Sequence, residues 1–375
     1  MVVVFAPLLV HGWCVAACRK GAMNPVPMEV QNISAEHCLP PAHGLYKLHG
    51  HNSTGGTGTH ECDLLSPPLP STWLCVHAPD KDVFISRGIV WKGGWTDRCN
   101  NEYRLRTLCR IVRAVREASL RSKKPVWVLD VGANIGTFTL PLLAAGVNVA
   151  SFEADASNLR LLRGSVAAQR KLHAADRLGA SIVVAGALSD TVGDELCLGT
   201  VAAKHGNEVN SGSVRVEAPG QVNCRQRTRT TTLDAALQTI LEYQRSTLMP
   251  SEEPGGRRRA VAGSSAERSL RVVAMKMDVQ GYESHVMGGG ARLLRESPPE
   301  TIFIESKNTT LIASLVDAGY VQCGKFKDGC DYNVRLERVR RSAAATDTSA
   351  SNPIVHDPLR QPHHRYFMCG AHAKH

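Results

Sequence analysis

The middle of the chain alternates between two hydrophobic patterns, one typical of buried strands and the other of amphipathic helices. Uninterrupted apolar runs closed by a glycine turn, as at 126–131, predict parallel strands covered on both faces. Apolar residues three or four positions apart, as in 156–169, predict helices with one buried face. Strands are expected at 82–86, 126–131, 147–152, 181–187, 271–277, 301–305, 320–326 and 333–336, and helices at 104–124, 137–145, 156–169, 232–243, 284–295 and 309–317. This order predicts an α/β fold with an open, mostly parallel sheet and helices on both faces.

Both ends of the chain and one internal segment lack this periodicity. Residues 1–18 are apolar and end in small residues, like a signal-peptide core, but they lack a basic start and contain His11. Segments rich in Pro, Gly and Ser predict a low-order lead-in at 19–81 and a disordered insertion at 250–269. Residues 342–375 predict a flexible, His-rich tail with a candidate last strand at 366–369. The folded domain is therefore expected over 82–341, with a hairpin in its polar stretch 191–229.

Composition excludes several broad classes of protein. The 375 residues are 43% hydrophobic and 21% charged, which is ordinary for a globular chain and excludes wholesale disorder. No apolar stretch approaches the roughly 20 residues of a membrane-spanning helix, so no stable transmembrane span is expected. The net charge of +10 is concentrated in part in the helix expected at 104–124, which carries six arginines and two lysines. A solvated helix face explains this helix better than a nucleic-acid patch, because no aromatic residues interleave with the arginines.

The cysteines and sequons leave the compartment undecided. Twelve cysteines are many for a reducing compartment, and Asn32, Asn52 and Asn308 each begin an N-x-S/T sequon. Together with the signal-like segment they are compatible with a secretory route, on which the cysteines would form disulfides. In the cytoplasm they would be buried thiols. His60-x-Cys62 and Cys75-x-His77 suggest zinc, but no Cys-x2-Cys pair accompanies them, so no metal site is predicted.

The most informative local motif is D-V-G-A-N-I-G at 130–136, which follows a buried strand and opens a helix. Glycines let the backbone approach a ligand, and a helix start offers free N–H groups. Seventeen residues after Gly136, the next strand ends in Glu153, placed for a bidentate grip on ribose hydroxyls. Because both features lie at expected strand ends, a nucleoside cofactor explains them better than a plain glycine turn and a solvent-exposed glutamate.

The form of the glycine motif selects among nucleoside cofactors. A dinucleotide fingerprint requires G-x-G-x-x-G, and the spacing here is G-x-x-x-G, which disfavours NAD. ATP and GTP are disfavoured because the motif has no P-loop lysine. An acidic residue, Asp130, stands two positions before the first glycine. This pattern fits S-adenosylmethionine (SAM), whose aminocarboxypropyl tail lies over the loop where a dinucleotide would place its pyrophosphate.

Between about residues 82 and 336 the chain resembles the FkbM-type methyltransferases. The motifs that carry the resemblance are VLDVGANIGTFTL (128–140), FEADASNLRLL (152–162), ALSD (187–190), TTLD (231–234), MKMDVQGYESHVMGGG (275–290) and IFIESK (302–307). Their order and spacing agree with the family throughout, apart from the insertion at 250–269. The resemblance implies the Rossmann-like class I methyltransferase fold, with a seven-stranded sheet, and SAM as the cofactor.

The resemblance also implies roles for individual positions. The glycine loop would surround the methionine moiety, Glu153 would hold the ribose, 188–190 would lie near the adenine, and Asp278 would face the methyl-bearing sulfonium. The candidate cofactor-binding residues are Asp130, Gly132, Ala133, Asn134, Gly136, Glu153, Ala154, Leu188, Ser189, Asp190 and Asp278. In one departure from the family, its usual D-V-E-G is D-V-Q-G here, with Gln280 in place of the glutamate.

Methyl transfer from a sulfonium requires mainly alignment of the nucleophile, and a hydroxyl acceptor also requires a base. The leading candidates are Asp278 and Glu305 at strand ends, followed by Glu283. His285 is assigned a surface role. Lys276 is assigned a structural one, because it lies one residue off the inward phase of its strand.

The expected activity is O-methylation of a hydroxyl on a small-molecule or glycan acceptor, as the family resemblance implies. The absence of an N-[DP]-P-[YF] loop, which many nitrogen methylators carry, favours oxygen. Two alternatives remain. Gln280 and the long extensions are compatible with a non-catalytic binding or scaffold protein that keeps the fold. The basic helix is compatible with a nucleic-acid methyltransferase, although nucleic acid is disfavoured as a partner.

Overall fold

The computed structural model describes a folded body between residues 45 and 339. The described residues are 45–48, 70, 72–78, 81–82, 85–92, 98–121, 124–173, 177–200, 214–217, 224–248, 270–325 and 333–339. The expectations for 1–18, for the insertion at 250–269, and for the tail at 342–375 with its strand at 366–369 lie outside them.

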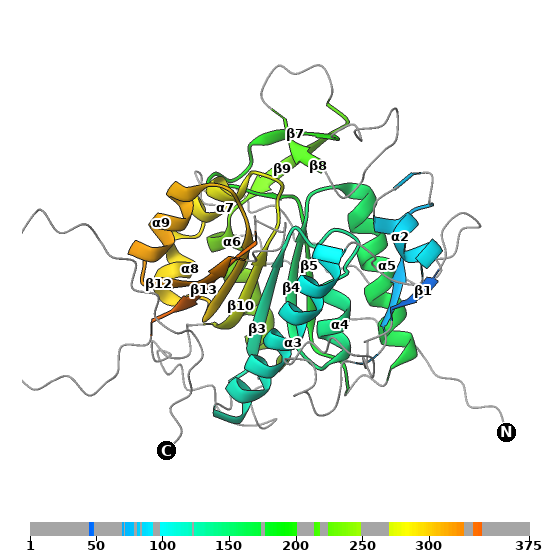
Figure 1. The fold of residues 1–375 in the computed structure, drawn as a ribbon, viewed down its shortest axis with the longest axis horizontal. Coiled ribbons are helices and arrows are strands. Elements are labelled where there is room, and N and C mark those ends of the chain that lie inside the picture. The colour runs from blue at the N-terminus through cyan, green and yellow to red at the C-terminus, as the bar shows by residue number, and fades with distance from the viewer. Residues whose placement is uncertain are drawn as a thin grey trace, which may run out of the picture.

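A seven-stranded sheet forms the centre of the molecule (Figure 1). Its strands are β3 (Val126–Val131), β4 (Asn148–Glu153), β5 (Ser181–Ala185), β10 (Arg271–Met277), β11 (Thr301–Glu305), β12 (Tyr320–Lys325) and β13 (Asn333–Arg338). They lie in the order β12-β13-β11-β10-β3-β4-β5, and only β13 runs antiparallel to the others. The predicted α/β fold with an open, mostly parallel sheet is therefore confirmed.

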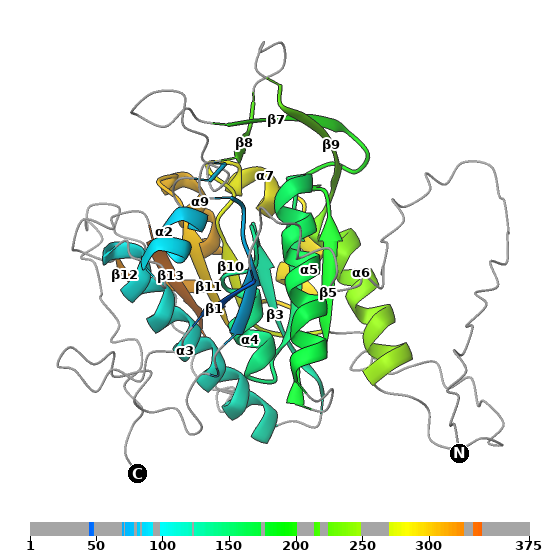
Figure 2. The same ribbon diagram turned by 90° about the vertical axis from the view of Figure 1, so that its right-hand side faces the viewer.

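Helices cover both faces of this sheet, as Figures 1 and 2 show. One face carries α2 (Ile85–Lys92), α3 (Arg98–Arg121), α4 (Thr139–Ala144) and α5 (Ala156–Leu172). The other carries α6 (Leu233–Tyr243), α7 (Glu283–Gly288), α8 (Ala291–Glu296) and α9 (Thr309–Asp317). Each set packs its apolar side chains against the sheet, which gives two hydrophobic cores. Within the described part of the chain, none of the helices combines the length and apolar character that crossing a bilayer requires.

Local hydrogen bonds explain where several helices begin. Asp155 accepts the backbone N–H groups of Ser157 and Asn158 at the start of α5, and Asn308 caps α9 through the N–H of Leu311. The strand expected at 82–86 is wrong, because the Asp82 carboxylate caps a helix there by accepting the N–H groups of residues 85 and 86. At this position the capping hydrogen bonds of Asp82 start a helix where the short apolar pattern predicted a strand.

The helix expected over 284–295 is two helices, because Gly289 and Gly290 separate α7, which ends at Gly288, from α8. A Cβ atom on Gly289 would lie 2.0 Å from the carbonyl oxygen of Ser189, so the backbone there presses directly against the neighbouring segment. This close approach ends α7, and α8 restarts at residue 291.

Part of the segment expected as a low-order lead-in is built into the core. The strands β1 (Leu45–Leu48) and β2 (Thr72–Cys75) pair antiparallel. Leu74, Cys75 and Val76 are almost fully buried in the core on the α5 side. Backbone groups of β2 bond to α5, since Ser165 Oγ accepts the N–H of Cys75 at 2.8 Å. Residues before position 82 thus contribute to the hydrophobic core.

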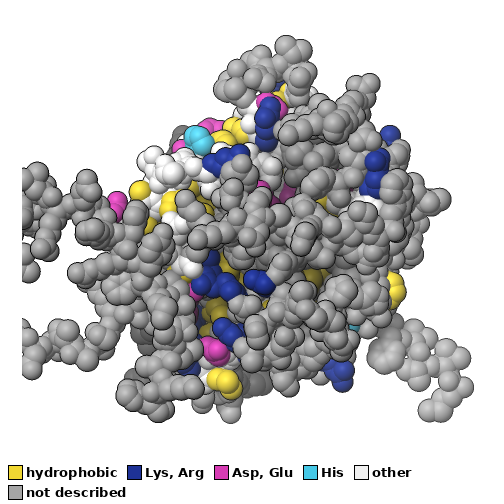
Figure 3. All heavy atoms as spheres, in the orientation of Figure 1, with side chains coloured by type: hydrophobic (Ala, Val, Ile, Leu, Met, Phe, Trp, Pro, Cys, Tyr) yellow, Lys and Arg dark blue, Asp and Glu magenta, His cyan; other side chains and the backbone are white. Residues whose placement is uncertain are grey.

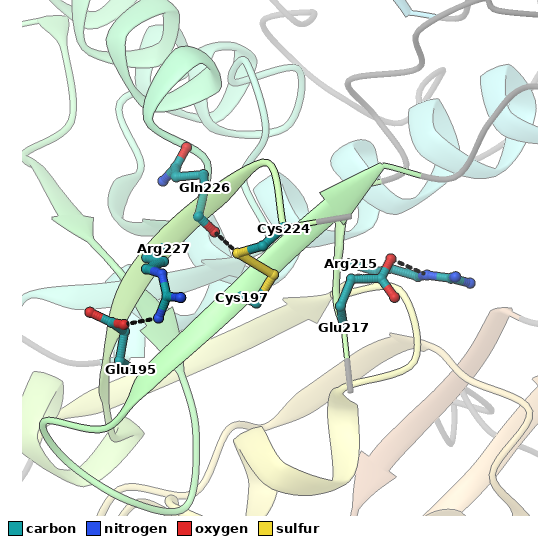
Figure 4. The surroundings of a disulfide bond; sticks show 7 residues. All are labelled: Glu195, Cys197, Arg215, Glu217, Cys224, Gln226 and Arg227. Atoms are coloured by element: carbon teal, nitrogen blue, oxygen red, sulfur yellow. Dashed lines mark hydrogen bonds and ion pairs between the residues drawn. A yellow bond between two sulfur atoms is a disulfide. The ribbon is translucent and has the colours of Figure 1, made fainter. Parts of the chain in front are cut away.

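A second, four-stranded sheet stands beyond the carboxyl ends of the parallel strands (Figures 1 and 2). It consists of β6 (Ala187–Leu188), β7 (Glu195–Thr200), β8 (Val214–Val216) and β9 (Gln226–Thr231), in the order β6-β9-β7-β8, where a hairpin was expected. A Cys197–Cys224 disulfide joins β7 to the residues before β9, between the ion pairs Glu195–Arg227 and Arg215–Glu217 (Figure 4). Cys75, Cys109 and Cys323 are disulfide-bonded as well. The name "flap" is used below for β7, β8 and β9.

One buried hydrogen bond fastens the end of α6 to the central strand. The indole N–H of Trp127 donates to Gln244 Oε1 at 2.9 Å, and both side chains are buried. We expect Gln244→Ala to lower the free energy of unfolding by about 1–3 kcal/mol, because it leaves the buried indole N–H without its acceptor. Urea denaturation measures the change. Glu242→Ala, on the exposed side of the same helix, should shift it by less than about 0.5 kcal/mol, and equal effects of the two substitutions would contradict this account.

Candidate functional site

The loop after β3 is shaped by left-handed backbone at three positions. Gly132, Asn134 and Gly136 have φ angles of +76°, +52° and +100°. The N–H groups of Gly132 and Ala133 both donate to the carbonyl oxygen of Phe152, at 3.0 and 2.9 Å. A Cβ atom on Gly132 would lie 1.9 Å from the carbonyl oxygen of Asp278. The first glycine is therefore required because two backbone segments touch there.

Glu153 ends β4 with its carboxylate turned into the glycine loop. One carboxylate oxygen accepts the N–H of Asn134 at 2.7 Å, and the other accepts the N–H of Asp155 at 2.8 Å. The side chain is 7% exposed. Burial raises the pKa of Glu153 to about 7, against the lowering effect of these two hydrogen bonds and of the Lys276 charge. The following residue, Ala154, accepts a hydrogen bond from Gln226 of β9, which ties the flap to this strand end.

Beneath the loop lies a buried ion pair. Asp130 is fully buried and accepts a hydrogen bond from Thr139 at 2.7 Å through Oδ2. Its other oxygen, Oδ1, lies 3.3 Å from the ammonium of Lys276 on β10. Lys276 also donates to the carbonyl oxygen of Gly132 at 2.6 Å. Asp130 therefore supports the loop from below, and its carboxylate is covered by protein.

Asp278 follows β10 and faces the same loop. Its N–H donates to the carbonyl oxygen of Val131 at 3.0 Å, and its side chain is 25% exposed. The amide of Gln280 donates to Asp278 Oδ1 at 2.7 Å, from a residue whose φ is +55°. Asp278 is thus the carboxylate at this strand end that is both accessible and held in place.

The other two candidate bases lie at or just beyond neighbouring strand ends. Glu283, at the start of α7, is buried, and its carboxylate accepts the N–H of Gly281 at 2.9 Å and the Ser306 hydroxyl at 3.4 Å. Burial, with a smaller contribution from the charge of Asp278, raises its pKa. Glu305 ends β11, is half-buried, and pairs in register with Asn333.

The segment expected near the adenine forms a cluster with α7. Leu188 and Ser189 are buried, whereas Asp190, two residues after β6 ends, is exposed. The Ser189 hydroxyl lies 3.2 Å from that of Tyr282, whose ring stacks on His285 with centroids 4.3 Å apart. Asp190 Oδ2 lies 3.2 Å from His285 Nδ1, and hydrogen bonds from His285 and then Ser189 lower the pKa of Asp190.

The structure thus joins most of the predicted site residues and adds others that the sequence did not single out. Hydrogen bonds and ion pairs connect the glycine loop, Glu153, Asp130 and Asp278, while Ser189 and Asp190 form a separate cluster with α7. Gln226 and Tyr282 were missed, whereas Lys276 and His285 were named but assigned a structural and a surface role. The signal for Lys276 was a lone charge in the apolar strand V-V-A-M-K-M.

Two other features from the sequence have structural explanations. The helix α3 is amphipathic as predicted, with its apolar face in the core and Glu117 paired to Arg113 and Arg121. On the face in Figure 3, lysine and arginine side chains of the described residues form several separate groups. Of the suggested zinc ligands, Cys75 is disulfide-bonded and His77 lies 2.7 Å from Asn158 Oδ1, while His60 and Cys62 lie outside the described residues. Within the described ranges, no three His, Cys, Asp or Glu residues gather as a metal site.

Comparisons with known proteins add little at the level of sequence. The chain matches no family model, and no curated protein matches it. Among solved structures it is similar to a "putative RNA methyltransferase" from Pyrococcus horikoshii, with 10% sequence identity and a TM-score of 0.27. That alignment covers 63% of this chain and 85% of the other.

The strand order itself identifies the fold. A seven-stranded sheet in which one antiparallel strand, β13, is inserted next to the parallel edge strand β12 has the arrangement of class I methyltransferases. The glycine loop after the first central strand and the acidic residue at the end of the next lie where that fold places them. The chain therefore has the Rossmann-like class I methyltransferase fold.

The contact at Gly132 can be tested by adding one methyl group. We expect Gly132→Ala to destabilise the protein by more than about 2 kcal/mol, because a Cβ would both strain the left-handed backbone and overlap the Asp278 carbonyl. Thermal and urea denaturation measure the loss. Gly319→Ala is the matched control, since Gly319 has a φ of +95° but open space around its Cβ position. Similar losses in both variants would show that backbone strain alone, and not the contact, makes Gly132 necessary.

Proposed function

We propose that this chain is a SAM-dependent methyltransferase of the FkbM type, which transfers a methyl group to a hydroxyl of a small-molecule or glycan acceptor. The observation that carries the proposal is the carboxylate of Glu153, held against the glycine loop at the carboxyl end of β4. Each of its oxygens accepts one backbone N–H and keeps further lone-pair capacity for a ribose hydroxyl.

The chemistry of the donor set fits SAM. Glu153 would hold the ribose, the loop from Gly132 to Gly136 would lie under the methionine moiety, and Ser189 with Asp190 would approach the adenine. The carboxylates of Glu153 and Asp278 suit a ligand that carries a sulfonium cation. Asp130, Ala154 and Leu188 would support the cofactor-binding residues without touching the cofactor. Asp130 and Leu188 are buried, and the carbonyl oxygen of Ala154 accepts a hydrogen bond from Gln226.

SAM, when bound, supplies a methyl group already activated for displacement. The residues around it then have two tasks, which are to align the acceptor hydroxyl and to accept its proton. Asp278 is accessible and fixed by Gln280, so it can orient the hydroxyl or accept its proton. Glu305 and Glu283 are the other candidate proton acceptors, and burial raises the pKa of Glu283, which makes it a stronger base than an ordinary glutamate.

The flap supports an acceptor site on the same edge of the sheet. It stands beyond the carboxyl ends of the parallel strands, where ligands bind in this class of fold. The Cys197–Cys224 disulfide joins β7 to the residues just before β9, and Gln226 connects the flap to Ala154 beside Glu153. The wall of an acceptor site could therefore come from the flap.

One observation favours a second candidate, a non-catalytic protein that binds SAM. Gln280 stands where the resembled family has glutamate, and its amide donates to Asp278 Oδ1. This hydrogen bond occupies a lone pair of Asp278 Oδ1 that could otherwise accept the proton of the acceptor hydroxyl. If Asp278 were the only base, this arrangement would favour binding without turnover.

Calorimetric titration with SAM at pH 6 and pH 8 tests the cofactor assignment. We expect binding that strengthens by about tenfold over this range, because a proton on Glu153, whose pKa is about 7, competes with its grip on the ribose. Glu153→Gln should weaken binding at pH 8 and remove most of the pH dependence. Glu242→Gln, far from the site, serves as the control. The assignment fails if folded wild-type protein binds no SAM or if Glu153→Gln binds it unchanged.

An assay for transfer of a labelled methyl group distinguishes a methyltransferase from a non-catalytic SAM-binding protein. With glycan and small-hydroxyl acceptor pools, we expect label in products that resist mild base, as ethers do and methyl esters do not. Asp278→Asn should reduce transfer at least about a hundredfold, because it removes the carboxylate that would orient the acceptor hydroxyl toward the methyl group, and should leave the fold intact. SAM binding without label in any pool would establish the scaffold candidate.

A further inference from the structure

Lys276 contacts three separate parts of the site from a buried position. Its ammonium lies 3.3 Å from Asp130 on β3 and 4.0 Å from Asp278 after β10. It donates to the carbonyl oxygens of Gly132, at 2.6 Å, and Val131, at 3.4 Å. The side chain is 10% exposed, and the ammonium also lies 5.5 Å from the centre of the Phe138 ring.

Part of this arrangement is explained by the cost of burying Asp130. Among the described residues, Asp130 Oδ1 accepts no hydrogen bond, so the ammonium balances the charge of that oxygen. An unpaired carboxylate at this depth would be strongly destabilising. Charge balance for Asp130 alone, however, does not require the short hydrogen bond to the Gly132 carbonyl or the approach to Asp278.

We infer that Lys276 is a positioning residue, which fixes the glycine loop and the Asp278 carboxylate relative to each other by contacting both from beneath. Its bearing on the cofactor rests on the proposed function. The loop would underlie the methionine moiety and Asp278 would face the sulfonium, so the same lysine sets the distance between the two halves of the SAM site.

The charge of Lys276 also acts on Glu153, at the end of β4. The charged groups that face it among the described residues are Asp130 on β3, Glu153 on β4 and Asp278 after β10, while the residues before α4 contribute only the Phe138 ring. The ammonium lowers the pKa of Glu153, against the effect of burial. Loss of the lysine should therefore move the pH midpoint of SAM binding upward, a change that a purely space-filling residue would not cause.

The test uses a double variant, because Lys276→Met alone would leave Asp130 buried without its charge partner and unfold the protein. Lys276→Met with Asp130→Asn removes both charges and keeps similar volumes. Asp130→Asn alone is the matched control. Amide hydrogen exchange of the cofactor-free protein over 131–138 should be about tenfold faster in the double variant than in the control, as expected when a hydrogen bond to a charged group is lost. Exchange in the rest of β3 should not differ.

SAM titration of the same proteins completes the test. In the double variant we expect affinity to fall about tenfold below the control, with the pH midpoint moved upward. Equal exchange and equal SAM binding in both variants would overturn the inference and reduce Lys276 to the charge partner of Asp130. If wild-type protein binds no SAM but the exchange difference is present, the proposed function fails while the positioning role of Lys276 stands.

Discussion

The contact between the loops after β3 and β10 is the constraint on which the rest of the site depends. The two strands are parallel neighbours, and their register places Lys276 beside Asp130 and Met277 beside Val131. The loops that follow β3 and β10 therefore leave the sheet side by side. They can do so only because Gly132 has no side chain where it meets the Asp278 carbonyl. Glu153 lies beside the same loop because the N–H groups of Gly132 and Ala133 donate to the carbonyl oxygen of Phe152, the residue before it in β4.

The close packing of strand ends also gathers several carboxylates at the carboxyl edge of the sheet. Asp130, Glu153, Asp278 and Glu283 lie at or just beyond adjacent strand ends, and Lys276 is the cation that the structure places among them. Burial disfavours the charged form of a carboxylate, so the pKa values of Glu153 and Glu283 rise while the more exposed Asp278 remains a ready partner for a positive charge. An excess of carboxylates in a partly covered site is suited to a cationic ligand, which would relieve their mutual repulsion.

The sequence predicted the elements whose signals are local and missed those that depend on distant contacts. The bounds of β10, β11 and α9 agree with the expected ranges, since apolar runs and the Asn308 cap lie within the elements themselves. The break between α7 and α8 depends on contact with Ser189, and burial of β2 depends on α5, so neither leaves a local pattern. The pairing of Lys276 with Asp130 depends on the register between β10 and β3, which are far apart in the sequence, so it leaves no local pattern either.

Within the proposed function, Gln280 changes which carboxylate is best suited to accept a proton. Its left-handed backbone places the amide beside Asp278, where a glutamate would add a further negative charge and could donate no hydrogen bond in its ionised form. The donated hydrogen bond fixes Asp278 and occupies one lone pair of its Oδ1 atom, which favours orientation of the acceptor over proton removal. Glu283 has the opposite environment, since it is buried and its pKa is raised. Within the proposed function, Gln280 therefore separates the two tasks of the site, with alignment at Asp278 and proton uptake favoured at Glu283.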